Sequence, residues 1–275
     1  MWTDSVNPKR KKDMNIVKIL IHGSTGKMGQ VLLSCARSDE SFTVEGELSR
    51  KNFAHIQVLA AGYASDVEDS FQGSDVAVDF SAPDATGQLV ACCVRYTMPL
   101  VIGTTGHTIG QLWEIENHAR TIPIVMASNF STGVNVLLWL TRKAAEILGP
   151  GFDLEIVETH HRNKKDAPSG TAKTLLGILR EVRNGQGVEM SPVHGREGWT
   201  GIRPQDKIGM HSVRGGDVVG DHTVHFLGSG ERIELTHRTS DREAFARGAL
   251  YAAKWVVTQP PGLYNMLDVL GLSQK

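Results

Sequence analysis

A short apolar run followed at once by a glycine-rich turn constrains the fold of this 275-residue chain more than any other feature. The run, residues 17–21, is rich in β-branched side chains, which is typical of a buried parallel strand. The turn carries Gly23, Gly26 and Gly29 and leads into the helical apolar pattern of residues 31–36. A strand, a glycine turn and a helix start in this order predict a site for a dinucleotide pyrophosphate. The Gly-x-x-Gly-x-x-Gly spacing is not the commonest fingerprint, so its position after a first strand carries the prediction.

Strands and helices then alternate, with short connections, as far as residue 126. Strands are expected at residues 43–48, 76–80, 100–102 and 122–126, and helices at 109–120 and, capped by residues 81–84, up to about residue 95. This alternation predicts an α/β fold with a Rossmann-type, doubly wound parallel sheet that binds ligands at the carboxyl ends of its strands. Two segments of small and hydroxyl residues occupy such ends and would let a flat ring approach the backbone; the alternative for each is a simple turn. They are Gly103-Thr104-Thr105 and Ala127-Ser128-Asn129-Phe130.

The end of the second expected strand bears on which cofactor is bound. A dinucleotide fold places the residue that reads the adenosine ribose about 20 residues past the glycines. Here Ser49 offers a hydroxyl, and Arg50 and Lys51 offer positive charge. This combination favours the 2′-phosphate of NADP, whereas an acidic residue would favour NAD. The alternative is a basic loop at the end of a strand without a ligand.

The pattern changes after a long apolar helix expected at residues 134–148. Three β-rich runs follow, at residues 208–213, 218–226 and 232–238, joined by glycine-containing turns at 215–216 and 228–230. They predict hairpins and a C-terminal α+β domain with a mixed or antiparallel sheet. The expected division is a disordered extension at 1–15, a dinucleotide-binding domain at 16–130 and 241–275, whose helix 241–258 packs back onto it, and a substrate-binding domain at 131–240.

Residues 155–172 concentrate the chemistry of the chain. An apolar strand breaks into five potential cations, and a helix start at Ser169-Gly170-Thr171 follows them: His160, His161, Arg162, Lys164 and Lys165. Cations that face a helix N-terminus form an anion site, and His and Lys there can donate protons. Asp166 is expected to orient Lys164 or to cap the helix. The competing interpretation is a solvated basic loop.

Composition excludes several classes of protein. A net charge of −1 argues against nucleic acid as the main partner. Three cysteines, two of them adjacent, favour reduced thiols in a cytoplasmic protein. No run approaches the roughly 18 apolar residues of a membrane span, and residues 1–15 lack the hydrophobic segment of a secretory signal. A zinc site at His160 and His161 is not expected, because neighbouring cations repel a dication.

The segment 155–172, with its two histidines, Lys164 and Pro168-Ser-Gly-Thr, resembles the signature of the dihydrodipicolinate reductase (4-hydroxy-tetrahydrodipicolinate reductase) family. The resemblance extends from Val17 to Leu272 and includes the glycine turn and residues 101–106, 127–130 and 218–222. It implies that His160 is the acid/base histidine and Lys164 the proton donor, with substrate contacts at His161, Gly170 and Thr171. The cofactor contacts that it implies are Gly23, Ser24, Thr25, Gly26, Lys27, Met28, Gly103, Thr104, Thr105, Ala127, Ser128, Asn129 and Phe130.

The resemblance also implies an oxidoreductase of lysine and diaminopimelate synthesis. Such an enzyme would use NADPH or NADH to reduce a cyclic dicarboxylate with loss of water, and would be a homotetramer assembled through the C-terminal domain. Ser49 departs from the family, because many relatives carry an acidic residue there; Arg50 still supports NADP. The residues alone do not decide whether His160 or Lys164 delivers the proton. The alternatives are another Rossmann-type dehydrogenase and a non-catalytic NAD(P)H-sensing module.

Overall fold

The structure, a computed structural model, describes residues 16–53 and 65–273, so the extension expected at residues 1–15 lies outside the described residues. The described chain divides into two compact units. Of the described residues, the first unit comprises 16–53, 65–126 and Ala249–Tyr264, and the second comprises Ala127–Gly248 and residues 265–273. Relative to the expected boundaries, residues 127–130, 241–248 and 265–273 therefore belong to the second unit.

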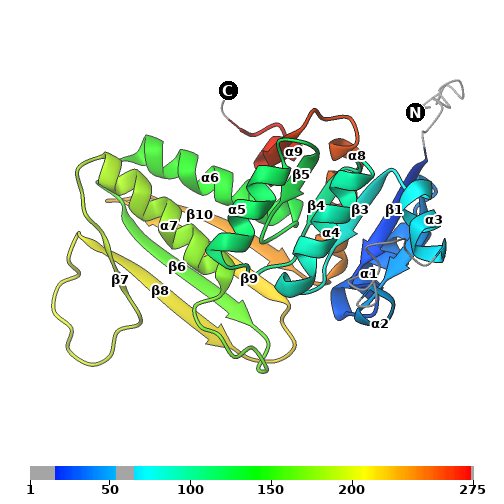
Figure 1. Cartoon of the computed structure of the whole chain (residues 1–275). Helices are drawn as coiled ribbons and strands as arrows, with labels where there is room; N and C mark the ends of the chain where they lie inside the picture. The colour runs from blue at the N-terminus through cyan, green and yellow to red at the C-terminus, as the bar shows by residue number, and fades with distance from the viewer. Residues whose placement is uncertain (1–15, 54–64, 274–275) are drawn as a thin grey trace, which may run out of the picture. The chain divides into compact units, whose positions relative to one another are not determined.

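The first unit contains a parallel sheet of six strands in the order β11-β5-β4-β3-β1-β2 (Figure 1). This order and the helices between the strands confirm the predicted Rossmann-type sheet. The short strand β11 lies at one edge beside β5 and was not predicted. The strands are β1 (Val17–His22), β2 (Phe42–Leu48), β3 (Val76–Asp79), β4 (Leu100–Ile102), β5 (Pro123–Met126) and β11 (Gly262–Tyr264).

The central strands of this sheet are buried along most of their length, as their apolar runs predict. Residues 19–21 of β1, 76–78 of β3 and all of β4 have no exposed surface. The helices are α1 (Lys27–Arg37), α2 (Arg50–Phe53), α3 (Ser65–Gly73), α4 (Pro83–Arg95) and α5 (Ile109–His118); α8 (Glu243–Val256) begins in the second unit and ends in the first.

Helix α4 begins differently from the expectation that residues 81–84 cap it. The N-cap residue is Ala82, which has no side chain able to accept a hydrogen bond, and Pro83 is the first helical residue. The Ser81 hydroxyl instead donates to Asp79 Oδ1 at 2.6 Å. The prediction of a side-chain cap was wrong because a buried carboxylate takes the serine that would have supplied it.

The second unit contains a mixed sheet of five strands in the order β10-β9-β6-β8-β7. Strands β6, β7 and β8 are parallel, whereas β9 runs antiparallel to both β6 and β10. The hairpin predicted at residues 228–230 joins β9 to β10, but β8 and β9 form no hairpin because β6 lies between them. The strands are β6 (Asp153–His160), β7 (Ser191–Val193), β8 (Lys207–Arg214), β9 (Gly220–Leu227) and β10 (Arg232–Thr239).

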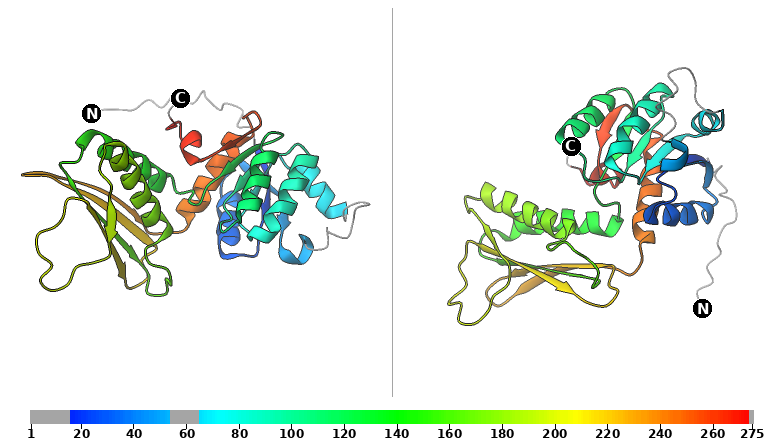
Figure 2. Two further views of the ribbon diagram at one scale, coloured as in Figure 1. Left: turned by 60° about the vertical axis from the view of Figure 1, so that its left-hand side comes forward. Right: turned by 60° about the horizontal axis from the view of Figure 1, so that its bottom comes forward.

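Helices α6 (Thr132–Leu148) and α7 (Gly170–Gly185) cover one face of this sheet (Figure 2). Burial alternates strictly along β6, so Leu154, Ile156, Glu158 and His160 are buried and the residues between them are only partly buried. Leu154 and Ile156 belong to the apolar core that the sheet forms with α7. Two polar residues therefore continue a row that begins as hydrophobic core. The short helix α9 (Met266–Val269) contacts α6.

No helix in the described parts of the chain is both long and apolar enough to cross a membrane.

Candidate active site and cofactor pocket

The glycine turn between β1 and α1 is held closed by contacts that only glycine permits. Gly23 has a φ of +83°, in the left-handed region that other residues rarely adopt. A Cβ atom on Gly29 would lie 2.1 Å from the carbonyl oxygen of Gly23, so any larger residue would push α1 away from the turn. The first turn of α1 has no side-chain cap and no acidic residue. Its free N–H groups and the helix dipole therefore favour an anion.

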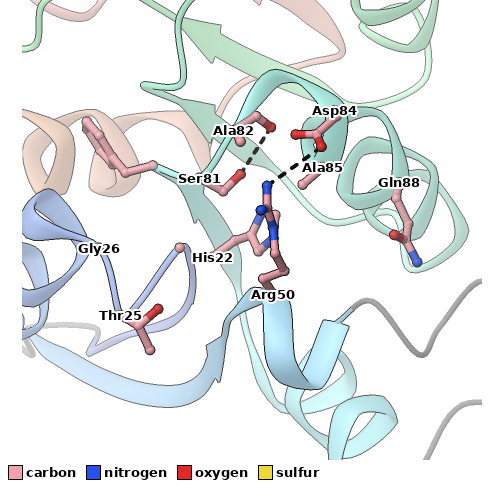
Figure 3. A pocket seen from close by; sticks show the side chains of 11 residues that line it. His22, Thr25, Gly26, Arg50, Ser81, Ala82, Asp84, Ala85 and Gln88 are labelled. Carbon is pink, nitrogen blue, oxygen red and sulfur yellow. Dashed lines mark hydrogen bonds and ion pairs between the residues drawn. The ribbon is translucent and has the colours of Figure 1, made fainter.

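A cavity of about 340 Å³ lies beside this turn, at the carboxyl ends of β1 and β3 (Figure 3). Four of the expected cofactor residues line it: Gly23, Thr25, Gly26 and Arg50. The remaining lining residues were not predicted, although the end of β3 was a place to look because ligands bind where parallel strands end. They are His22, Phe80, Ser81, Ala82, Asp84, Ala85 and Gln88.

A buried carboxylate organises the wall of this cavity. Asp79 has no exposed surface and lies 2.9 Å from Nδ1 of His22, and its oxygens also accept hydrogen bonds from the hydroxyls of Ser81 and Thr86. Burial pushes the pKa of Asp79 up, but the hydrogen bonds from His22, Ser81 and Thr86 outweigh burial and hold that pKa below its ordinary value. Asp79 is therefore a fixed negative charge that orients His22 and Ser81.

Ser49 and Arg50 have different positions although they are adjacent. Ser49 is buried, and its hydroxyl donates to Oδ1 of Asn52 at 3.2 Å. Arg50 lines the cavity and lies 3.7 Å from Oδ2 of Asp84, with most of its side chain exposed (Figure 3). The structure therefore offers an exposed positive charge at the cavity, whereas the Ser49 hydroxyl is paired with Asn52 of the adjacent helix α2.

The other expected cofactor residues lie around the cavity or in the second unit. Ser24 turns inward and donates to the carbonyl of Leu48, and Lys27 and Met28 begin α1. Thr104 is buried and accepts a hydrogen bond from the backbone N–H of Ser81 at 2.9 Å. Residues 127–130 belong to the second unit, where the Asn129 amide donates to the hydroxyl of Thr171 at 3.3 Å.

His160, the last residue of β6, contacts a carboxylate on its own strand. Its Nδ1 atom lies 2.5 Å from Oε2 of Glu158, whose side chain has no exposed surface. Burial lowers the pKa of His160 below its ordinary value, Glu158 opposes this, and Lys164 and Arg214 add to it. His160 is therefore poised to be neutral at physiological pH and to exchange a proton readily.

Arg214, on the neighbouring strand β8, pairs with the same carboxylate. Its two terminal nitrogens lie 2.8 and 2.7 Å from the two oxygens of Glu158. Burial raises the pKa of Glu158, but the hydrogen bonds from Arg214, Ser212 and His160 outweigh burial and lower the pKa to about 2. Neither Glu158 nor Arg214 was singled out from the sequence. The sequence could have pointed to Glu158, because it follows Leu154 and Ile156 at every second position and so lies on the buried face of the strand. A carboxylate on that face needs a buried partner.

Lys164 lies in the loop between β6 and α7, and its Nζ is 3.0 Å from Oδ1 of Asp166. This pairing agrees with the first of the two roles expected for Asp166. The second role belongs to Ser169, whose hydroxyl accepts a hydrogen bond from the N–H of Ala172 and caps α7. Helix α7 therefore begins where the sequence predicted, immediately after the cationic loop.

Two further histidines approach the same cluster. The ring of His222, on β9, lies 5.2 Å from the ring of His160 in an edge-on arrangement, and its Nε2 is 3.1 Å from the Ser169 hydroxyl. Burial, then His160, lowers the pKa of His222 to about 4, so it stays neutral. In His161 the Nδ1 atom is buried and has no hydrogen-bond partner among the described residues. A buried polar atom in this state is available to a ligand.

Comparison with known proteins covers both units. The family model for the N-terminus of dihydrodipicolinate reductase matches residues 17–130, and the model for its C-terminus matches residues 133–270. The 4-hydroxy-tetrahydrodipicolinate reductase of Akkermansia muciniphila is 49% identical over 259 residues, which are 94% of this chain and 100% of that protein. The reductase of Syntrophotalea carbinolica is 42% identical over 267 residues, 94% of this chain and 100% of that protein.

Solved structures agree with this result. A dipicolinate-bound dihydrodipicolinate reductase from Paenisporosarcina sp. TG-14 has a TM-score of 0.73 and 25% sequence identity, covering 92% of this chain and 98% of that one. A probable dehydrogenase from Thermotoga maritima shares the fold alone, with a TM-score of 0.54 and 11% identity over 93% of both chains. Since both family models match consecutive parts of the sequence and relatives align over nearly its whole length, the chain belongs to the dihydrodipicolinate reductase family.

Proposed function

We propose that this protein is a 4-hydroxy-tetrahydrodipicolinate reductase, an oxidoreductase that uses NADPH or NADH to convert 4-hydroxy-tetrahydrodipicolinate into tetrahydrodipicolinate and water, on the diaminopimelate route to lysine. The observation that carries the proposal is the clustering of His160, His161 and Lys164 beside the start of α7, in a chain whose two units match the two family models. A cyclic dicarboxylate needs such a combination of cations and backbone donors.

The substrate carboxylates are bound by His161 and the start of α7. The buried Nδ1 of His161 has no partner among the described residues and is free to meet a carboxylate. The backbone N–H groups of Gly170 and Thr171 lie in the first turn of α7, where the helix dipole favours negative charge. The space around Gly170 is open, with no described atom within 4 Å of where a Cβ would lie, so a ligand can approach its backbone.

The hydride goes to one carbon of the ring, and the proton that the neighbouring carbon then needs comes from His160 or Lys164. The Asp166 carboxylate holds Lys164 at 3.0 Å, and the Glu158 carboxylate holds His160 at 2.5 Å, so both donors are oriented by an acid. The low pKa of His160, which burial causes, makes its imidazolium a stronger acid than a free histidine. Both geometries support a donor role.

The residues around the glycine turn fit a nicotinamide dinucleotide. The uncapped start of α1 offers N–H groups to a pyrophosphate, and the cavity next to it is flanked by Arg50, which can reach an adenosine 2′-phosphate. The bound dinucleotide supplies the hydride. The remaining contacts proposed for it are those of residues 24–28, 103–105 and 127–130, with Ser49 bonded to Asn52 in the short helix α2 that carries Arg50.

Assembly and location complete the proposal. Strands β7 and β10 are the edges of the five-stranded sheet, and an edge strand of eight residues such as β10 presents backbone groups to which another chain can pair. This supports a homotetramer assembled through the second unit, which would then serve both substrate binding and oligomerisation. The three free cysteines support the reducing environment of the cytoplasm.

The product of the reaction tests the proposal. With dihydrodipicolinate synthase supplying the substrate and NADPH deuterated at the transferring carbon, mass spectrometry should find a product that has lost one oxygen atom and gained one deuterium. A product that retains the hydroxyl, or that lacks the deuterium, would exclude this reductase reaction.

A further inference from the structure

Glu158 is a buried charge that the proposed reaction does not itself require. It lies two residues before His160 on the same face of β6, has no exposed side-chain surface, and accepts from His160, Arg214 and the backbone N–H of Ser169. Burying a carboxylate is costly unless it is paired and hydrogen-bonded. Stability alone is therefore a weak explanation for Glu158 at this position.

The charge state of Glu158 determines which nitrogen of His160 carries the hydrogen. Because Arg214 contacts both of its oxygens, Glu158 stays ionised, and an ionised carboxylate only accepts hydrogen bonds. The Nδ1 atom of His160, 2.5 Å away, must therefore be the donor. In the neutral ring, Nε2 is then the atom that takes up and releases the proton.

The surroundings of Nε2 agree with this assignment. Nε2 has no hydrogen-bond partner among the described residues, and the side chain keeps 10% of its surface exposed. A Cβ atom on Gly220 would lie 3.0 Å from Nε2, so the glycine at the start of β9 leaves space beside it. The charged and titratable groups that face the ring are Glu158, Lys164, Arg214 and His222.

Arg214 also connects this histidine to the loop that bears Lys164. One of its terminal nitrogens donates to the backbone carbonyl of Asp166 at 2.8 Å, and the carboxylate of Asp166 pairs with Lys164 at 3.0 Å. The register of the parallel pair places Arg214 opposite His160 itself. The guanidinium of Arg214 thus holds Glu158, the partner of His160, and also the loop that carries Lys164.

We propose that Glu158 and Arg214 are positioning residues of the active site: Glu158 holds His160 as the Nδ1–H tautomer, which leaves Nε2 to exchange the proton, and Arg214 locks Glu158 and the Lys164 loop in place. The effect of these residues on turnover rests on the proposed function, but the assignment of the His160 tautomer does not depend on it. The inference can therefore be tested separately from turnover.

The first test is nitrogen NMR of the full chain labelled with ¹⁵N-histidine, with His160→Gln used to assign the resonances. In the wild type at neutral pH, Nδ1 of His160 should be protonated and Nε2 should not. Glu158→Gln should invert this, because its single amide oxygen is taken by Arg214 and its NH₂ then faces Nδ1. A wild-type His160 that is protonated on Nε2, or a tautomer that Glu158→Gln leaves unchanged, would overturn the proposal.

Glu155→Gln is the matched control. Glu155 lies on the same strand and pairs with Arg196, Arg203 and His211. Burial raises its pKa, but the hydrogen bonds from these three residues outweigh burial and lower the pKa to about 2. It occupies the other face of the sheet from His160. This control should keep the wild-type tautomer of His160. A change in the His160 tautomer as large as that in Glu158→Gln would mean that loss of any charge on β6 is sufficient.

Kinetics provide the second readout. Glu158→Gln should lower kcat by about a hundredfold with little change in KM, and should shift the acid limb of the pH profile down because the carboxylate no longer favours the imidazolium. Arg214→Lys, which keeps the charge but loses the paired contact, should lower kcat by about tenfold. A Glu158→Gln variant whose KM rises as much as its kcat falls, and whose pH profile is unshifted, would contradict a positioning role for Glu158. An inactive wild type would refute the reductase, while the NMR result would still decide the tautomer.

Discussion

Arg214 binds both carboxylate oxygens of Glu158, at 2.8 and 2.7 Å, although 56 residues of sequence separate the two side chains. The pair joins parallel neighbours β6 and β8, and its carboxylate also contacts His160. The hydrophobic row on β6 therefore ends in an ionic cluster at the point where the cationic loop begins.

Acid should destabilise the fold through His222. Its folded-state pKa of about 4, lowered from 6.5 first by burial and then by His160 and only partly opposed by Glu158, means that the unfolded chain binds the proton more readily. Stability is therefore complete above pH 6.5 and falls as the pH drops towards 4. The free energy of unfolding of the wild type should fall between pH 7 and pH 5, and in His222→Gln this fall should be smaller by about 2 kcal/mol. Urea unfolding at the two pH values measures the difference.

His225→Gln is the control for this prediction. His225 lies on the same strand but is partly exposed beside Glu234. It should keep the wild-type pH dependence of the unfolding free energy. His160 and His237, whose pKa values are also lowered by burial, remain in both variants and leave a residual slope of the same sign. An unchanged slope in His222→Gln would contradict the account.

Lys164→Ala should cut turnover by about a hundredfold and leave cofactor affinity nearly unchanged, because the role proposed for its ammonium is towards the substrate and not the cofactor. Its neighbour Lys165 is exposed and has no assigned role, so Lys165→Ala is the matched control and should retain activity. Steady-state kinetics and fluorescence titration with NADPH measure the two effects. If Lys164→Ala abolishes NADPH binding, the residue has been assigned to the wrong ligand.

Arg50→Ala should weaken NADPH binding by about tenfold and leave NADH binding almost unaltered, because only NADPH carries the 2′-phosphate. Lys51 is exposed and does not line the cavity, so Lys51→Ala should leave both affinities near those of the wild type. Calorimetric titration with each cofactor gives the ratio of the NADPH affinity to the NADH affinity. If Arg50→Ala leaves this ratio unchanged, Arg50 does not contact the 2′-phosphate.

Gly29→Ala should abolish cofactor binding, because its Cβ would lie 2.1 Å from the carbonyl of Gly23 and would displace the start of α1. Gly87→Ala, in α4, adds a Cβ with no described atom within 4 Å and should bind the cofactor normally. This control should also stabilise its helix, by about 1 kcal/mol. Retained NADPH binding in Gly29→Ala would show that the turn tolerates a wider opening.

The sequence predicted the parts of the fold that local patterns determine. Each buried run, at β1, β3 and β4, is one uninterrupted stretch of sequence, and so is the turn at Gly23. Apolar patterning and glycine spacing are therefore enough to locate them. Strand β11 has only three residues and pairs with β5 from the far end of the chain, and no local pattern marks it. Strand β6 separates β8 from β9, an arrangement that a glycine pair at 215–216 cannot reveal.

The same distinction applies to the site. His160, Lys164 and Ser169 lie within ten residues, so the sequence alone predicted that they lie together at a helix start; in the structure His160 ends β6 and Ser169 caps α7. Arg214 and His222 reach this cluster from β8 and β9, so their position depends on sheet register. Pairing over such separations is a property of the tertiary fold, which a single sequence does not display.

The most direct test of the account is reductase turnover in a coupled assay. Dihydrodipicolinate synthase supplies the substrate, and the purified chain is added with NADPH or NADH while the reduced-nicotinamide absorbance is followed. The account predicts that absorbance falls only when synthase, its substrates and the chain are all present, and that Lys164→Ala slows the fall. No consumption of either cofactor by a folded, cofactor-binding wild type would contradict it.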